Sequence, residues 1–322
     1  MRHPAAPLLA IGALLLMAAS LVRAADDVPP PWAFAVNPPG IKPVPDDGQP
    51  RRVPGSDATF SLTQIRDLYN VPDWHPDTHP PMPGMVGHGP REGAFACAFC
   101  HLPNGLGRPE NASLAGLPED YILRQVADFR SGARKSSETR NLPGALMVKV
   151  AQSASEADVR VAAQYFAALK PQPWLRVIEI DTVPRTHVAG WMLVADEPAA
   201  TEPIGRRIIE VPEDLERTEL RDASSGFIAY VPQGSVDRGR QLVDSASGKP
   251  QRCSICHGPD LKGLGPIPAL AGRSPSYLVR QLYDLQHGTR RGPWSSLMLS
   301  VVAELSEDDM IAIAAYAASL PP

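Results

Sequence analysis

The sequence predicts a mainly α-helical protein in which two tandem copies of one helical domain are joined by a small β-rich insert and preceded by an extended N-terminal arm. Three observations lead to this fold class. The chain matches itself at an offset of 156 residues, each copy contains segments with helical apolar spacing, and a stretch rich in β-branched residues separates the copies. The predicted domains are residues 85–173 and 233–322, with the insert at 174–232 and the arm at 25–84.

Residues 1–24 have the pattern of a secretory signal peptide. Met1-Arg2-His3 is a short positive start, an apolar run extends from Ala5 to Leu21, and Val22-Arg23-Ala24 places small residues at −3 and −1. This pattern predicts cleavage after Ala24 and export to the periplasm. The alternative is an uncleaved membrane anchor, for which the apolar run is near the lower limit of length.

Composition and charge narrow the classes of function. Removal of the signal leaves about 298 residues with 29 basic side chains against 35 acidic ones, so the formal charge is −6. Because no basic patch is present, a nucleic-acid partner is not expected. The chain contains 36 prolines, concentrated in residues 25–90 and 171–232, which predicts extended connecting segments there.

The individual elements follow from composition and spacing. Residues 26–70 are rich in Pro, Gly and charge, which is typical of an extended arm. Helices are predicted at Glu119–Ser131 and Ser155–Leu169 in the first copy, and at Pro275–Gln286 and Ser306–Leu320 in the second. Strands are predicted in the insert at Arg176–Val183, Val188–Val194, Arg206–Val211 and Gly226–Val231.

All four cysteines lie in two Cys-x-x-Cys-His pentapeptides, Cys97-Ala-Phe-Cys100-His101 and Cys253-Ser-Ile-Cys256-His257. Two thiols at this spacing can form thioether bonds to the vinyl groups of one porphyrin, and the adjacent histidine can then ligate its iron. The motifs therefore predict two covalently attached c-type haems. The alternatives are thioredoxin-like dithiols or a split zinc site, but zinc needs its second cysteine pair roughly 15–20 residues away.

The internal repeat extends well beyond these pentapeptides. Polar residues and glycines match without a gap: Arg124-Gln125, Gly132 and Arg134 fall on Arg280-Gln281, Gly288 and Arg290. After a five-residue adjustment, Leu146-Met147 falls on Leu297-Met298. A shared core periodicity would align apolar positions but would not reproduce Arg-Gln, Gly and Met in register. Duplication of one haem-binding unit accounts for the match.

Met147 and Met298 are predicted as the sixth ligands of the two irons. Each follows a leucine in a segment predicted to be a loop between two helices, and the two occupy matching places in the repeat. Methionine on the far face raises the reduction potential and suits an electron carrier, whereas an open position suits a catalyst. The alternative is packing in the core, which is the role expected for Met310.

Residues 74–85 concentrate His75, His79, Met82 and Met85 among prolines. Such side chains can bind copper or donate an axial ligand. A run of this kind can also be a rigid lead-in whose side chains pack on the first haem domain, and this is the expected role. The first possibility leaves a copper or haem chaperone as a further class of function.

The two copies resemble the class I cytochromes c and, within them, the di-haem cytochrome c4 group. The second copy carries most of the resemblance, in Cys253–Asp260, Leu270-Ala-Gly272, Tyr277–Leu282, Gly288-Thr-Arg290, Met298, Leu305–Asp309 and Ala315–Leu320. The resemblance implies two helical haem domains, His/Met ligation of both irons and periplasmic electron transfer. Cytochromes c commonly place a Pro-x-Leu carbonyl against the axial histidine, and Pro268-Ala269-Leu270 matches this pattern. Ala112-Ser113-Leu114 in the first copy lacks the proline.

The predicted function is periplasmic electron transfer from a dehydrogenase or quinol-oxidising complex to a terminal acceptor such as an oxidase, either as a free carrier or as a dehydrogenase subunit. No catalytic residue is expected, and membrane contact is expected only through an uncleaved signal or a partner complex. The alternative is a di-haem enzyme. A peroxidase needs one exchangeable sixth position, against which Met147 and Met298 argue. A thiosulfate dehydrogenase type favours an extra cysteine ligand, and no cysteine is spare.

Overall fold

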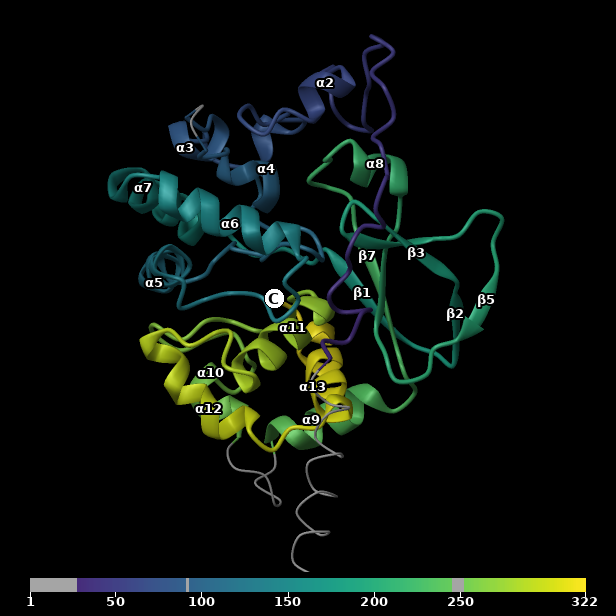
Figure 1. Ribbon diagram of the computed structural model, residues 1–322, viewed down its shortest axis with the longest axis vertical. Coiled ribbons are helices and arrows are strands. Elements are labelled where there is room, and N and C mark those ends of the chain that lie inside the picture. Colours follow the sequence, from purple (N-terminus) through teal and green to yellow (C-terminus); the bar gives the residue numbers. More distant parts are fainter. Residues whose placement is uncertain (1–27, 91–92, 245–251) are drawn as a thin grey trace, which may run out of the picture.

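The computed structural model describes residues 28–90, 93–244 and 252–322, so the predicted signal peptide lies outside the described residues. Two helical units stack along the long axis of the molecule, and short strands lie along one side of them (Figure 1). Within the described ranges, no helix combines the length and the apolarity needed to cross a membrane.

Helical unit one consists of α4 (Cys97–His101), α5 (Glu119–Ser131), α6 (Leu142–Ser153) and α7 (Glu156–Ala168). Helix α7 begins where the Ser155 side chain accepts a hydrogen bond from the amide of Asp158. Helix α5 ends at Gly132, whose φ of 75° is a left-handed conformation that glycine adopts without strain. Ile122 and Phe166 bring α5 and α7 together in a buried core.

Helical unit two consists of α9 (Ser235–Asp244), α10 (Cys253–His257), α11 (Pro275–Gln286), the short 3-10 turn η2 (Pro293–Ser295), α12 (Ser296–Val302) and α13 (Glu307–Ser319). Helix α13 begins with a capping box between Ser306 and Asp309. Helices α9 and α13 pack closely at Gly239, where a Cβ atom would lie 2.0 Å from the carbonyl oxygen of Ala312. Any larger residue at Gly239 would therefore force these helices apart.

The helices predicted at Glu119–Ser131 and Pro275–Gln286 are confirmed, whereas the loops predicted around the two methionines are wrong. Met147 lies on α6 and Met298 lies on α12. The Asn141 side chain accepts a hydrogen bond from the Gly144 amide and so starts α6, with a proline in the first turn. Proline is favourable there because the first amides of a helix need no intrahelical acceptor. A Pro-Gly pair that resembles a loop signal is thus the start of a helix.

Seven short strands lie between Leu175 and Val231 in the described chain: β1 (Leu175–Glu179), β2 (Thr182–Pro184), β3 (Thr186–Ala189), β4 (Met192–Ala195), β5 (Thr201–Pro203), β6 (Ile209–Pro212) and β7 (Phe227–Val231). We call residues 175–231 the strand segment. Strands β1, β7 and β6 form one sheet in that order, and β2–β5 and β3–β4 form two antiparallel pairs. The segment also contains helix α8 (Leu215–Glu219), which the sequence pattern did not predict.

The strand segment is attached to both helical units. Just before it, the Trp174 indole donates a hydrogen bond of 2.9 Å to the carbonyl of Gly272 in unit two. On β6, the buried carboxylate of Glu210 accepts hydrogen bonds from the hydroxyls of Ser274 (2.7 Å) and Ser276 (2.6 Å) at the start of α11. Asn104 of unit one donates a hydrogen bond of 2.6 Å to Ala223. The segment therefore contacts both units rather than only linking them in sequence.

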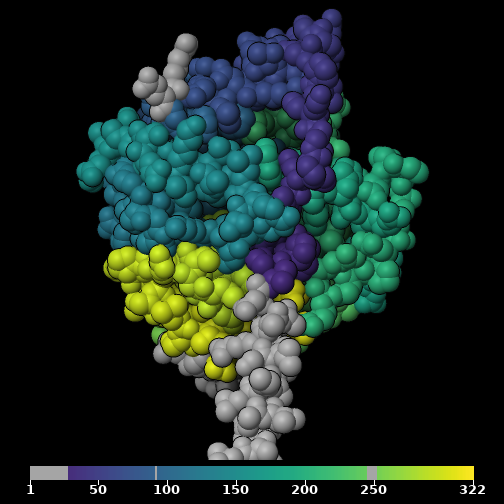
Figure 2. Space-filling model, in the orientation of Figure 1, coloured from purple at the N-terminus to yellow at the C-terminus, as the bar shows by residue number. Residues whose placement is uncertain are grey.

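The arm is mostly extended, with short helical turns α2 (Leu62–Ile65), η1 (Pro76–Thr78) and α3 (Gly84–Gly87). Figure 2 shows its first part, in purple, beside unit one and the strand segment, and at its start Phe34 packs on Tyr283 in the core of unit two. Val53, Ile65 and Trp74 of the arm form a small buried core with Leu220, which follows α8. The Trp74 indole also donates a hydrogen bond of 2.8 Å to the Leu220 carbonyl. The arm and the strand segment thus pack as one layer.

The two helical units meet through a pair of arginines that the repeat places in matching positions. Arg134 donates hydrogen bonds to the Tyr277 hydroxyl (2.9 Å) and the Gln281 side chain (2.6 Å) of unit two. Arg290 reciprocally donates to Tyr121 (3.0 Å) and Gln125 (2.9 Å) of unit one. The backbones of Arg134 and Arg290 also form an antiparallel bridge. The polar matches in the repeat are therefore the contacts that join its two copies.

Replacing Tyr121 or Tyr277 with phenylalanine should destabilise the interface to a similar extent in each case. Each change removes a hydrogen bond to a buried guanidinium, which is worth about 1.5–3 kcal/mol. Urea unfolding of the holoprotein measures the change. Tyr230→Phe is the matched control, because its hydroxyl has no hydrogen-bond partner within the described structure. A loss in the Tyr230 variant equal to that of the other two would contradict the interface assignment.

Candidate haem-binding site

One continuous cavity lies between the two helical units and reaches both pentapeptides. It is lined by all eight residues that the sequence predicted as attachment points or ligands, namely Cys97, Cys100, His101, Met147, Cys253, Cys256, His257 and Met298. The fold thus brings together residues that are 156 positions apart in sequence. In each unit the cavity wall has the cysteines and the histidine on one short helix and the methionine on another.

Each motif histidine is oriented by a backbone carbonyl. The Nδ1 atoms of His101 and His257 lie 2.8 Å from the carbonyl oxygens of Ala112 and Pro268, respectively. Because a carbonyl can only accept, Nδ1 is the protonated nitrogen and Nε2 keeps its lone pair. Burial is the largest effect on both rings and lowers the pKa of His101 and of His257. Both imidazoles are therefore neutral at physiological pH, as an iron ligand must be.

The contact to Ala112 shows that the first unit orients its histidine without the proline of the Pro-x-Leu pattern. A second backbone hydrogen bond closes the loop in both copies, from Gly107 to the His101 carbonyl and from Gly263 to the His257 carbonyl. Both glycines have positive φ, 67° and 86°. The loop geometry therefore depends on glycine, and any residue can supply the carbonyl.

The cysteines lack the properties of a reactive dithiol. Burial raises the pKa of Cys97 to about 12 and also raises the pKa values of Cys100 and Cys253. Redox dithiols instead need a lowered thiol pKa, because the thiolate is the nucleophile. Across the described residues, no three His, Cys, Asp or Glu side chains form a group that could hold a metal ion. The geometry thus gives no support to the thioredoxin-like and zinc alternatives.

The histidines of residues 74–85 are engaged in protein contacts. His75 Nε2 lies 2.9 Å from a carboxylate oxygen of Asp222 in the strand segment. His79 contacts Asp73 at 3.2 Å and the Tyr165 hydroxyl of α7 at 3.1 Å, and the hydrogen bond to Asp73 raises the pKa of His79. These contacts support the lead-in role expected for the run. Its last methionine, Met85, is buried and contributes to the cavity wall.

Six arginines also line the cavity, and the repeat had marked all of them except Arg252 and Arg273: Arg124, Arg134, Arg252, Arg273, Arg280 and Arg290. Within the described residues none of them forms an ion pair with a carboxylate. Most of them donate instead to neutral acceptors, as Arg273 does to the Ser113 hydroxyl (2.8 Å) and the Ala115 carbonyl (3.0 Å). The Nε atom of Arg290 is buried and has no acceptor among these residues.

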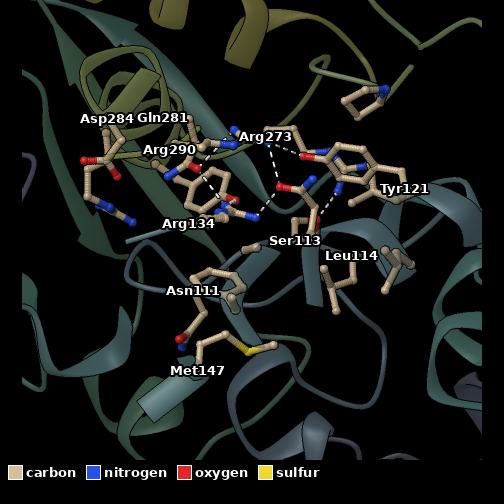
Figure 3. A pocket seen from close by; sticks show the side chains of 18 of the residues that line it. Asn111, Ser113, Leu114, Tyr121, Arg134, Met147, Arg273, Gln281, Asp284 and Arg290 are labelled. Carbon is tan, nitrogen blue, oxygen red and sulfur yellow. Dashed lines mark hydrogen bonds between the residues drawn. The ribbon is translucent and has the colours of Figure 1, made fainter. Parts of the chain in front are cut away.

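This arginine cluster fits the propionates of haem. Among the described residues two acidic side chains, Glu110 and Asp284, line the cavity beside the six arginines, and burying a cation that lacks an ion-pair partner costs free energy. Carboxylates presented by a cofactor would offset that cost and would supply acceptors for the remaining N–H groups. Figure 3 shows Arg134, Arg273 and Arg290 gathered at one part of the cavity, with Met147 apart from them. The cavity therefore has a cationic part, which suits the carboxylates of a porphyrin, and Met147 lies apart from it.

A further arginine, which does not line the cavity, approaches the first motif from the strand segment. The Arg221 guanidinium lies 3.5 Å over the Phe99 ring and donates a hydrogen bond of 2.7 Å to the Phe99 carbonyl, between the two cysteines of that motif. Burial lowers the pKa of Arg221 to about 9, so the side chain still carries its charge at neutral pH. Sequence reasoning missed this residue because it lies 122 positions from Phe99, in an insert that shows no motif.

Three curated proteins place the chain among known families. A thiosulfate dehydrogenase electron acceptor from Thiomonas intermedia is 28% identical over 235 residues, covering 71% of this chain and 80% of that protein. A cytochrome c4 from Azotobacter vinelandii is 27% identical, covering 69% and 83%. A cytochrome c-554(548) from Halomonas halodenitrificans is 39% identical over 79 residues, which are 24% of this chain and 95% of that protein. The chain belongs to the c-type cytochromes.

No protein-family model matches the chain. Its cytochrome c4 relative from Azotobacter vinelandii nevertheless covers 69% of the chain, and with the cytochromes c4 it is a di-haem c-type cytochrome. The cytochrome carries two covalently attached haems and transfers electrons. The duplicated motif, the shared cavity and the cationic cluster all agree with this assignment.

In this cytochrome, Arg221→Gln should lower the reduction potential of the first haem and leave the second unchanged. A nearby cation disfavours the ferric state, which carries one more positive charge, so its removal should shift the potential by something on the order of tens of millivolts. Redox titration of the holoprotein measures both potentials. The single-haem variant Cys253→Ala/Cys256→Ala assigns the first of them.

Arg176→Gln is the matched control for this change, because it removes an exposed cation of the same segment that pairs with Glu213. Equal shifts in the two variants would show that net charge, and not the position of Arg221, sets the potential.

Proposed function

We propose that this cytochrome is a periplasmic carrier that accepts electrons from a dehydrogenase and passes them to a terminal acceptor. A thiosulfate dehydrogenase is the proposed donor class, because two relatives of 27–28% identity, from Thiomonas intermedia and Stutzerimonas stutzeri, are electron acceptors of that enzyme. The periplasmic location is proposed from the signal pattern of residues 1–24. The proposed boundaries of the haem domains remain 85–173 and 233–322.

The ligand set we propose is the same in both domains. Cys97 and Cys100 attach the first haem and Cys253 and Cys256 attach the second, while His101 and His257 ligate the irons from the motif side. Met147 and Met298 are the proposed sixth ligands. Their shared place in the cavity wall supports this proposal, since Met310 is buried in the core of unit two and does not line the cavity.

The protein's part in electron transfer is to hold and tune each haem. Haem iron supplies the chemistry, a reversible one-electron change. The carbonyls of Ala112 and Pro268 fix the imidazole orientation, and hydrogen bonds of this kind raise ligand basicity. The apolar walls exclude water, and the arginine cluster compensates negative charge. Because one cavity reaches both motifs, the two haems lie in one molecule with their motifs facing the same space.

A di-haem enzyme is the second candidate, and the single observation against it is the symmetry of the cavity. Peroxidase chemistry needs one iron with an exchangeable sixth position. Here a methionine on a helix lines the cavity in each unit, and each motif histidine makes the same carbonyl contact at 2.8 Å. Two equivalent sites favour a carrier over a catalyst.

Replacing Met147 or Met298 with leucine should open one iron to carbon monoxide and lower the potential of that haem. Leucine keeps the volume, so the fold should be retained, while the thioether that raises the potential is lost. The reduced spectrum with carbon monoxide and a redox titration report the two effects. Met310→Leu is the control and should change neither. If Met147→Leu binds no carbon monoxide, the first haem has another sixth ligand.

Electron transfer itself can be tested with the purified holoprotein. A purified thiosulfate dehydrogenase with thiosulfate should reduce both haems in a stopped-flow experiment. The cytochrome alone should turn over neither peroxide nor thiosulfate, because both sixth positions are proposed to be closed. Peroxidase or thiosulfate-oxidising activity that disappears in a haem-ligand variant would replace the carrier with an enzyme.

A further inference from the structure

The two haem units differ sharply in what covers the surface beside their motifs. Phe99, between the cysteines of the first motif, is 6% exposed, whereas Ile255 at the matching position of the second is 63% exposed. Further along the same loop, Arg108 is 8% exposed and its counterpart Leu264 is 61% exposed. None of these four residues lines the haem cavity. The difference therefore reflects what packs on the outside of each unit.

In unit one, a single loop of the strand segment packs on this surface. Arg221 stacks on Phe99 and donates to its carbonyl, as described above. Arg108 donates a hydrogen bond of 3.3 Å to the carbonyl of Thr218, and Asn104 donates to the carbonyl of Ala223. Residues 218–223 thus make contacts at positions 99, 104 and 108 of the first unit. The arm adds a further layer, in which His75 pairs with Asp222 of this loop.

The same surface of unit two has no such cover among the described residues. Its loop has the same local geometry, because Gly263 donates to the His257 carbonyl as Gly107 does to that of His101. Ile255 and Leu264 therefore occupy the positions that the loop 218–223 contacts in unit one. Both are apolar, and the second replaces a charged residue. Ile255 and Leu264 are among the most exposed large apolar side chains of the described residues.

We propose that the surface of Ile255 and Leu264 is the docking site for the redox partner, and that residues 218–223 occupy the equivalent surface of unit one within the chain itself. The occupant is a redox protein that presents an apolar face around the exposed edge of its own cofactor. The chain's own repeat supports this occupant, since the matching surface in unit one is already packed by protein. This inference rests on the proposed carrier function and specifies which haem exchanges electrons with the partner.

The Arg221 cation beside the first motif favours electron flow from the second haem to the first. Electron tunnelling falls steeply with distance, so a partner seated beside the second motif exchanges electrons with that haem first. The cover on unit one excludes water and places the Arg221 cation beside the first motif. Both effects disfavour the ferric state of the first haem. Electrons that enter at the second haem are therefore drawn towards the first.

The test compares surface variants of the holoprotein in stopped-flow reduction by two protein probes. The probes are a thiosulfate dehydrogenase with thiosulfate, and reduced horse cytochrome c. Ile255→Ser/Leu264→Ser should lower the bimolecular rate with each probe at least tenfold, while reduction by the small complex hexaammineruthenium(II) stays within twofold. Val161→Ser/Leu215→Ser is the matched control, since both residues are exposed apolar positions elsewhere, 44% and 38% exposed. Equal rates for the two double variants with both protein probes would overturn the docking site.

Single-haem variants provide a second readout that does not depend on the surface changes. The variant Cys97→Ala/Cys100→Ala keeps only the second haem, and the rates of the two single-haem variants with reduced horse cytochrome c are compared with each other. Cys253→Ala/Cys256→Ala, which keeps only the first, should react at least tenfold more slowly. The reverse order would overturn the proposal. If horse cytochrome c shows the expected pattern while the dehydrogenase reduces no form of the protein, the docking site stands and the proposed donor is wrong.

Discussion

The reciprocal pair of Arg134 and Arg290 is the contact on which the rest of the molecule depends. Each guanidinium crosses from its own unit to a tyrosine hydroxyl of the other, and both donate to the two glutamines that follow the matching arginines of the repeat. A buried cation that loses one neutral acceptor has few other partners available, so this interface tolerates little relative movement. A fixed interface keeps both motifs on the wall of one cavity.

The strand segment and the arm make the surroundings of the two haem units different. Duplication alone would give two haem environments with equal access to solvent and partners. The loop 218–223 packs beside the first motif, and residues 74–75 of the arm cover that loop through Trp74, Leu220 and the His75–Asp222 pair. The start of the arm packs instead on unit two, where Phe34 lies in the core with Tyr283. The segment also holds unit two through Glu210 and the hydroxyls of Ser274 and Ser276. One added element therefore distinguishes the two haems without altering either ligand set.

The sequence allowed the haem motifs, the repeat and several helices to be predicted because each leaves a local pattern. The Cys-x-x-Cys-His spacing is fixed by the porphyrin, and α5 and α11 show clear apolar periodicity within capped boundaries. The helical state of Met147 was not predictable in this way, since its helix begins with Asn, Pro and Gly, which also occur in loops. Arg221 was not predictable either. Its contact with Phe99 joins residues 122 positions apart, and no local pattern records a contact of that kind.

The matched positions of the repeat also show how the same residues can set both the reduction potential of a haem and the access of a partner protein to it. At position 99 an aromatic ring accepts the Arg221 cation on its face, whereas isoleucine at position 255 offers no π surface to a cation. The substitution therefore does two things at once. It removes the anchor that would hold a covering loop on unit two, and it leaves apolar area for a partner to bury. The loop 218–223 and the residues at positions 99 and 108 act together, because the loop contacts Phe99 and Arg108 in unit one and their counterparts Ile255 and Leu264 are exposed in unit two.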